Sequence, residues 1–172
     1  RRVRPPGSTP TPASPPSRMQ GARSVASWRI GYLAVQHERE PFKRKKIRQA
    51  ITAALSAAAI TAAVEPQAIA SSLVLPRSVW ASADTPPLTA GDPAAAKRLL
   101  TEAGVGQGVS ASLVVDTSAG PEVARAADAI RAALGPASIA VTIRSLAGDP
   151  ALHAMQNGAQ DLVLTEAQAE GG

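Results

Sequence analysis

The sequence has no cysteine and few aromatic residues, and both absences narrow the classes of protein that it can encode. Without cysteine there is no disulfide scaffold, no thiol nucleophile and no cysteine-ligated zinc site. Aromatic residues make up 2 % of the 172 residues, and none follows Trp80. Alanine contributes about a fifth of the chain, and 45 % of all residues are hydrophobic. We therefore expect one globular domain with a core of small and aliphatic side chains.

The sequence has more basic than acidic residues, and this excess comes from one end of the chain. The formal net charge is +5 and the isoelectric point is about 10.4. Residues 1–48 carry a net charge of +10, whereas residues 49–172 carry −5. The basicity therefore belongs to the N-terminal segment, and the remaining sequence is mildly acidic. The lack of cysteine suits either redox environment and leaves the compartment open.

The first 27 residues are rich in proline, serine and arginine, and they contain almost nothing that a core could bury. Such a composition predicts a disordered tail. Residues 12–15 (PASP) have the PxxP spacing that an SH3-like groove binds, although a plain polar linker is the simpler interpretation. The first methionine is Met19, so we expect that Arg1 is not a natural start and that upstream sequence is missing.

The order of apolar patterns and turn signals predicts an α/β fold. Strands are expected at residues 28–35, 109–116, 138–145 and 161–165. Helices are expected at residues 43–64, 93–103 and 121–134 and from residue 149, and Asp92 has the place of an N-cap. From residue 92 onward helices and strands alternate, which favours helices that cover a largely parallel sheet.

Apolar residues at helical spacing indicate which helix faces are buried. In the helix at residues 43–64, one face carries Ile47, Ile51, Leu55 and Ala58. Ile60 and Val64 lie on its opposite side, so we expect this helix to be buried on more than one face. The stripes of the next two helices comprise Ala96, Leu99, Leu100 and Ala103, and Val123, Ala127, Ile130 and Leu134.

No motif in the sequence indicates catalysis or a bound cofactor. Residues 104–108 (GVGQG) look like part of a phosphate-binding loop, but they follow a helix and precede a strand, so no helix N-terminus would face an anion. His37 and His153 are far apart in sequence and lack a ligand-spaced partner, and we assign neither a role. The acidic residues are scattered without a pair arranged for acid–base chemistry. We therefore expect no enzyme activity, no metal and no cofactor.

The densest run of charge is at residues 43–46 (KRKK). It would suit phosphate groups or anionic lipid, or it is a solvated helix start, although cations at a helix N-terminus oppose the macrodipole. With the alanine-rich run at residues 50–64 and Ala-x-Ala at residues 68–70, it also imitates a secretory signal. That apolar run is too short, and alanine too weakly apolar, for a membrane span.

Five short motifs occur in a fixed order along the chain. Residues 31–36 (GYLAVQ), 40–42 (EPF) and 47–51 (IRQAI) follow the pattern YLAFN…kPF…vRqAi. Residues 75–80 (LPRSVW) follow iPp…W, and residues 92–104 (DPAAAKRLLTEAG) follow DpekAkkLLaEAG. The set resembles the family 5 extracellular solute-binding proteins of peptide and nickel ABC transporters.

The resemblance implies an α/β fold with a mixed sheet covered by helices, like the second lobe of a type II periplasmic binding protein. Residues 1–27 would be the tail and residues 28–172 the C-terminal lobe, with the first lobe absent and the chain a fragment or a truncated gene product. Two departures stand out. The acidic turn that the family has after PF is Lys43-Arg44 here, and the usual DR inside the helix is replaced by residues 56–58 (SAA).

The resemblance also implies one ligand contact. The family often has a W-x-A-D element after the last strand, whose carboxylate receives the α-ammonium group of a peptide. On this chain the element falls on residues 167–170 (AQAE), so the tryptophan is lost and the aspartate becomes Glu170. Glu170 is therefore the expected substrate-binding residue. So close to the chain end, its carboxylate would be solvated and would contribute little binding energy.

In function, the resemblance implies the substrate-binding component of an ABC importer for small peptides or similar solutes. Two lobes would close over the solute without covalent chemistry, and the protein partner would be a transporter permease. The resemblance places the protein itself outside the cytoplasm, in the periplasm or on the cell surface as a lipoprotein. No signal peptide is expected at the N-terminus of this chain. The alternative is a truncated remnant that does not bind, or a module whose basic segment docks on an acidic partner such as nucleic acid. The tail at residues 1–27 has no aromatic residue to stack on bases, which weakens the nucleic-acid hypothesis.

Overall fold

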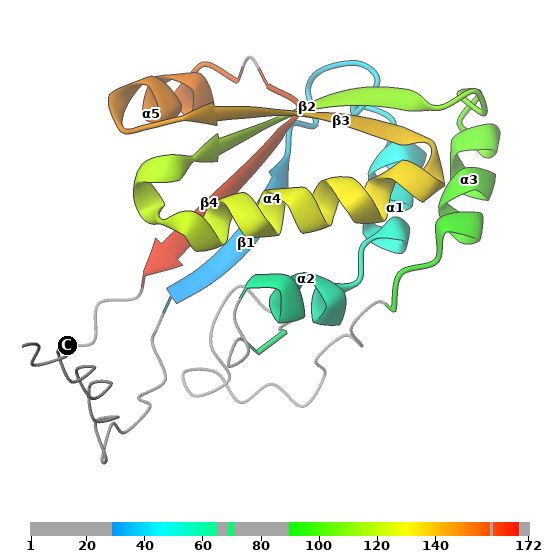
Figure 1. The fold of residues 1–172 in the computed structure, drawn as a ribbon. Coiled ribbons are helices and arrows are strands. Elements are labelled where there is room, and N and C mark those ends of the chain that lie inside the picture. Colours follow the sequence, from blue (N-terminus) through cyan, green and yellow to red (C-terminus); the bar gives the residue numbers. More distant parts are fainter. Residues whose placement is uncertain (1–28, 65–68, 71–89, 159, 169–172) are drawn as a thin grey trace, which may run out of the picture.

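Four strands form one mixed sheet with helices on both of its faces (Figure 1). The computed structural model describes residues 29–64, 69–70, 90–158 and 160–168. The strands are β1 (Arg29–Val35), β2 (Val109–Asp116), β3 (Ile139–Leu146) and β4 (Leu162–Gln168). The helices are α1 (Lys45–Ala54), α2 (Ala57–Val64), α3 (Pro93–Glu102), α4 (Pro121–Leu134) and α5 (Asp149–Gln156). Short 3-10 turns η1 (Thr117–Ala119) and η2 (Gly135–Ala137) follow β2 and α4.

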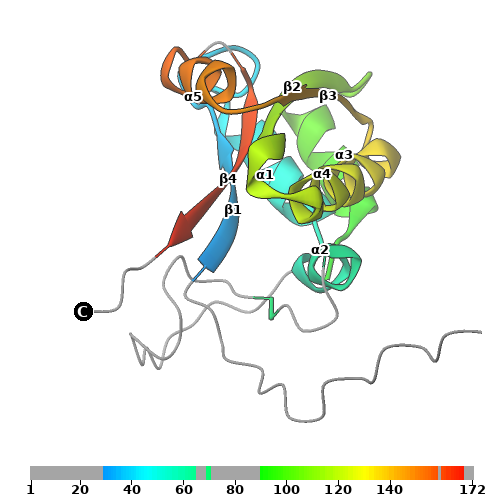
Figure 2. The ribbon, with the colours of Figure 1, turned by 60° about the vertical axis from the view of Figure 1, so that its left-hand side comes forward.

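The strand order is β1-β4-β2-β3, so β2 and β4 are the inner strands. β2 pairs in parallel with β3 along its whole length and with β4 at Leu113–Val115, whereas β1 is antiparallel to β4. The β2–α4–β3 and β3–α5–β4 connections step across the sheet in opposite directions. Because such connections are right-handed, α4 and α5 cover opposite faces, as Figure 2 shows. The predicted mixed α/β sheet is therefore confirmed.

The two faces of the sheet are covered unequally. Leu113 and Val115 face the larger layer, where α4 packs on the sheet and residues of α1 and α3 complete the same core. Val114 points to the opposite face and is buried outside that core, as is Ala151 of α5, which packs against β2. Many of the buried side chains are alanines, and among the described residues Phe42 is the one buried aromatic side chain. The core is therefore built of small and aliphatic residues, as the composition predicts.

Most predicted elements agree with the structure to within a few residues. β2 and α4 have the predicted bounds, and the predicted stripe of α4 is fully buried at Val123, Ala127, Ile130 and Leu134. Asp92 is the N-cap of α3, because its Oδ1 accepts a hydrogen bond from the Ala95 amide at 2.9 Å. The predicted tail at residues 1–27 and the motif at residues 75–80 lie outside the described residues.

The single helix predicted at residues 43–64 is wrong, because the chain breaks it at Leu55 and Ser56. Leu55 has extended backbone, and Ser56 forms a bridge with Ala90. The Ser56 hydroxyl then accepts a hydrogen bond from the Ala59 amide at 3.3 Å, so a cap residue in mid-pattern starts a second helix. Since α2 points in a new direction, Ala58 is exposed and no residue of α2 is buried, which contradicts the expected burial on several faces.

A side chain of α4 holds this second helix in place. The Arg125 guanidinium donates from Nε (3.2 Å) and Nη2 (3.0 Å) to the carbonyl oxygen of Val64, the last residue of α2. A cation at a helix C-terminus also stabilises the helix dipole. α2 is strongly apolar but spans only eight residues, and no helix within the described ranges is long and apolar enough to cross a membrane.

Two glycines near the start of β2 and β3 give a matched test of this packing. Gly108 has φ +105, and a Cβ there would lie 2.5 Å from the Ser138 carbonyl oxygen, whereas a Cβ on Gly135 would meet nothing within 4 Å. We expect Gly108→Ala to lower the free energy of unfolding by about 1–3 kcal/mol. Gly135→Ala should leave it unchanged or raise it by up to about 1 kcal/mol. Urea denaturation checks both, and equal midpoints for the two variants would contradict the packing described.

Candidate functional site

The carboxyl ends of the three parallel strands meet at one edge of the sheet. β2 ends at Asp116, β3 at Leu146 and β4 at Gln168, and all three strands point toward the left of Figure 1. α4 and α5 both start from loops at this edge. In open α/β sheets, ligands bind outside the carboxyl ends of the strands. We therefore take this carboxyl edge as the candidate site.

Asp116 joins the two loops of the carboxyl edge. Its Oδ1 accepts hydrogen bonds from the Ser118 amide (2.9 Å), the Ser118 hydroxyl (2.6 Å) and the Gly148 amide (3.2 Å). Next to it, the Thr117 hydroxyl donates to the Leu146 carbonyl oxygen at 3.0 Å. The loop after β2 is thus fastened to the loop after β3, and the starts of α4 and α5 are fixed relative to each other.

These donors hold Asp116 in its charged form. The hydrogen bonds from the Ser118 hydroxyl and amide lower the pKa of the Asp116 carboxyl, with a smaller effect from the Gly148 amide. The second oxygen, Oδ2, accepts no hydrogen bond from the described part of the chain. The arrangement therefore presents an oriented carboxylate oxygen that suits a cation or an N–H donor.

Other carboxylates lie at the same edge. Asp149 is the first residue of α5, Glu122 lies in the first turn of α4, and Glu166 lies near the end of β4. A Cβ on Gly120 would lie within 2.5 Å of a Glu122 carboxylate oxygen, so that carboxylate folds back over the start of its own helix. Acidic groups at helix N-termini are favoured by the macrodipole. The edge is consequently rich in negative charge.

The residues singled out from the sequence are not gathered at one site. Glu170 lies outside the described residues, two positions after the end of β4, so its predicted contact remains a prediction. His37, after β1, and His153, on α5, are both exposed. The glycines at residues 104–108 connect α3 to β2, as predicted. The described residues contain no group of three or more His, Asp or Glu that could hold a metal ion.

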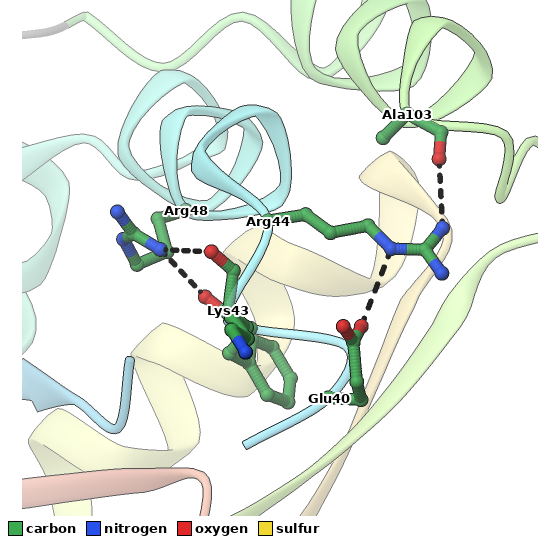
Figure 3. Close-up of polar contacts among 6 residues, drawn as sticks. Glu40, Lys43, Arg44, Arg48 and Ala103 are labelled. Carbon is green, nitrogen blue, oxygen red and sulfur yellow. Dashed lines mark hydrogen bonds and ion pairs between the residues drawn. The ribbon is translucent and has the colours of Figure 1, made fainter. Parts of the chain in front are cut away.

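The basic run at residues 43–46 connects α1 to α3 (Figure 3). Arg44 Nη1 donates to the Ala103 carbonyl oxygen at 3.0 Å, and Arg44 Nε lies 3.2 Å from a Glu40 carboxylate oxygen. Lys46 Nζ lies 2.8 Å from Glu102 Oε2, and this contact lowers the pKa of the Glu102 carboxyl. The cations that oppose the dipole of α1 therefore stabilise the C-terminus of α3. Two of the four are thus engaged within the chain rather than free for phosphate or lipid.

Arg48 lies in the first turn of α1, and its side chain bonds the backbone of the segment just before the helix. Its Nη1 donates to the carbonyl oxygens of Phe42 and Lys43, both at 2.8 Å (Figure 3). The Phe42 side chain is fully buried in the core. The bond from Arg48 to the Phe42 carbonyl oxygen therefore fixes the backbone at the point where that side chain enters the core. The matched arginine of the IRQAI motif is therefore structural.

Asp116 was not among the residues predicted from the sequence. The available signal was an aspartate at the end of the strand predicted at residues 109–116, followed by Thr117 and Ser118. Asp followed by Ser two residues on is typical of a side chain that caps its own loop. The bond to Gly148 spans 32 positions and depends on the β2–β3 pairing, so no local pattern could indicate it.

The lowered pKa of Asp116 predicts a pH-dependent contribution to stability. Its folded pKa lies below the ordinary value of 3.8, so its contribution is complete above that pH and is lost as the pH falls through the folded pKa. We expect Asp116→Asn to lower the free energy of unfolding by about 1 kcal/mol near neutral pH. The difference from the wild type should shrink in acid.

Asp128→Asn is the control, because Asp128 is an exposed carboxylate on α4 that pairs with Arg131 at 2.8 Å, away from the edge. An exposed pair contributes little, so this variant should stay within about 0.5 kcal/mol of the wild type. Denaturation across a pH series measures all three proteins. An Asp116→Asn effect that is equal at every pH would contradict the assignment.

Solved structures of solute-binding proteins share this fold. The chain is 28 % identical to the dipeptide-binding protein of Pseudoalteromonas sp. SM9913 in complex with Met-Leu, with a TM-score of 0.74 over 83 % of this chain and 29 % of that one. HbpA2 from Haemophilus parasuis is 20 % identical, with a TM-score of 0.75 over 83 % and 29 % of the two chains. Periplasmic DppA from Helicobacter pylori, in complex with the peptide STSA, is 21 % identical, with a TM-score of 0.71 over 83 % and 28 %. The chain therefore spans less than a third of each, and its fold is that of type II periplasmic binding proteins.

A family model matches nearly the whole chain, whereas the search of curated protein sequences found no match. The family described as bacterial extracellular solute-binding proteins, family 5, middle part, matches residues 4–171. That range includes β1, the arginine-closed turn and the carboxyl edge described above. The chain therefore belongs to the family 5 bacterial extracellular solute-binding proteins.

Proposed function

We propose that this chain is the C-terminal lobe of an ABC importer's solute-binding protein for small peptides or similar solutes. The observation that carries the proposal is the family match over residues 4–171. The fold shared with a dipeptide-binding protein at 28 % identity supports peptides as the solute class. In this proposal residues 28–172 are the lobe and residues 1–27 a tail.

The proposed mechanism is binding without covalent chemistry. The solute lies against the carboxyl edge, and a second lobe closes over it, as in hinge-type binding proteins. Asp116 Oδ2 and the Glu170 carboxylate would receive cationic or N–H groups of the solute, with Glu170 on the α-ammonium group. Since Asp116 is already oriented by Ser118 and Gly148, it would lose little freedom on binding.

The family is described as extracellular, so we propose a location outside the cytoplasm and a transporter permease as the protein partner. Delivery of a solute to a permease requires that the solute leave unchanged, which fits a role without catalysis. In the alternative, a basic docking module, Arg44 and Lys46 would not take part, because they are engaged in contacts within the chain. The basic residues at positions 1–27 lie outside the described residues.

Calorimetric titration with dipeptides and oligopeptides tests the proposal on this chain and on a longer version that supplies the rest of a family 5 protein. We expect binding of peptides with a free α-ammonium group and weaker binding of their N-acetylated forms. Glu170→Gln should weaken binding roughly two- to five-fold, which is the loss of affinity expected when one exposed ion pair is removed.

The matched control is Glu38→Gln, which makes the same chemical change at an exposed residue in the turn after β1. This variant should bind as the wild type does. If neither version of the protein binds any peptide or other small solute, the proposed function is wrong. If peptides bind and Glu170→Gln has no more effect than Glu38→Gln, the function stands and the role of Glu170 is wrong.

A further inference from the structure

Asn157 is the only asparagine in the 172 residues, and a glycine follows it directly. It is the C-cap of α5, where its amide donates to the His153 carbonyl oxygen at 3.0 Å. Its side chain is exposed. The primary amide is therefore accessible to water, and it makes no hydrogen bond within the described part of the chain.

The backbone nitrogen of the next residue, Gly158, is free to attack that side chain. Gly158 has φ +58 and no Cβ to obstruct its own nitrogen. Within the described ranges, its amide donates no hydrogen bond, whereas its carbonyl oxygen accepts one from Arg39 Nη1 at 3.4 Å. A Cβ at position 158 would lie 2.8 Å from Gln36 Nε2, so packing favours glycine here. The packing therefore favours glycine at the position directly after the single asparagine.

From this geometry we infer that Asn157 is a site of spontaneous deamidation. The Gly158 nitrogen attacks Asn157 Cγ, a C–N bond forms, and the side-chain nitrogen leaves as ammonia. The resulting five-membered succinimide then takes up one water and opens to aspartate or isoaspartate. No oxidant, metal or second protein is needed, and asparagine is among the thermolabile residues.

The required rotation moves Gly158 and leaves the last hydrogen bond of α5 in place. Asn157 has φ −76 and ψ −4, so its Cα–C bond must turn to bring the Gly158 nitrogen under Cγ. That rotation leaves the Asn157 amide bonded to His153, because the amide precedes the rotating bond. The helix therefore does not have to unfold for the ring to close.

The products would disturb the entry to β4. A new carboxylate at the C-terminus of α5 opposes the helix dipole, and isoaspartate adds a methylene group to the backbone shortly before Asp161. Asp161 Oδ2 accepts bonds from the Ser112 amide (2.8 Å) and hydroxyl (2.9 Å), and its carbonyl oxygen accepts the Gln36 amide at 2.8 Å. These contacts fix where β4 begins, so the modified chain should unfold at a lower temperature.

Ageing of the purified full chain at mildly alkaline pH and physiological temperature tests the inference by intact mass. We expect a gain of about 1 Da with release of ammonia, faster at higher pH, together with isoaspartate in the peptide that holds residue 157. Asn157→Gln is the control and should show neither change. Asn157→Asp, made directly, should unfold at a slightly lower temperature than the wild type.

A parallel incubation in denaturant sets the reference for an unprotected chain. Modification of the folded protein at a rate comparable with that of the unfolded chain supports the inference. A folded protein whose mass stays constant while the denatured chain gains the mass would overturn it. A gain of mass that persists in Asn157→Gln would overturn it as well.

Discussion

The parallel pairing of β2 with both of its neighbours is the interaction on which the rest of the structure depends. β2 bonds β3 along its whole length and β4 near its centre, so both of its edges carry partners. Parallel neighbours need crossover connections, and these place α4 on one face and α5 on the other. The same pairing brings three carboxyl ends to one edge, where Asp116 joins the two loops. The candidate site is therefore a consequence of strand order rather than of a local motif.

Charge and small side chains then decide how the helices pack. Alanines at the contacts of α1, α3 and α4 allow the helices to approach closely, with little bulk to separate them. The basic run that conflicts with the dipole of its own helix is explained by the neighbouring helix end, since Arg44 bonds Ala103. Acidic groups lie instead at the starts of α4 and α5, where the helix dipoles favour them. The sequence-wide basicity thus says little about the charge of the carboxyl edge.

Periodicity predicted the elements well where burial and local signals agree. The bounds of β2 and α4, the Asp92 cap and the buried stripe of α4 follow from residue spacing alone. The break at Ser56 was missed, because a serine hydroxyl that caps a helix start competes with helix-forming alanines on both sides. The contact between Asp116 and Gly148 joins residues far apart in sequence, so it required the sheet. The resemblance supplied the family, whereas only the fold showed which carboxylate is oriented.

In the proposed function, solute binds at the carboxyl edge of β2, β3 and β4. An amide-resolved NMR titration of the chain with short peptides tests it most directly, because it reports the position of weak as well as tight binding. We expect the amide signals of Ser118, Gly120 and Gly148 to shift with peptide concentration, together with those near the end of β4. Shifts confined to the opposite end of the sheet, around Gly108 and Ser138, would contradict it, as would a spectrum that no peptide changes.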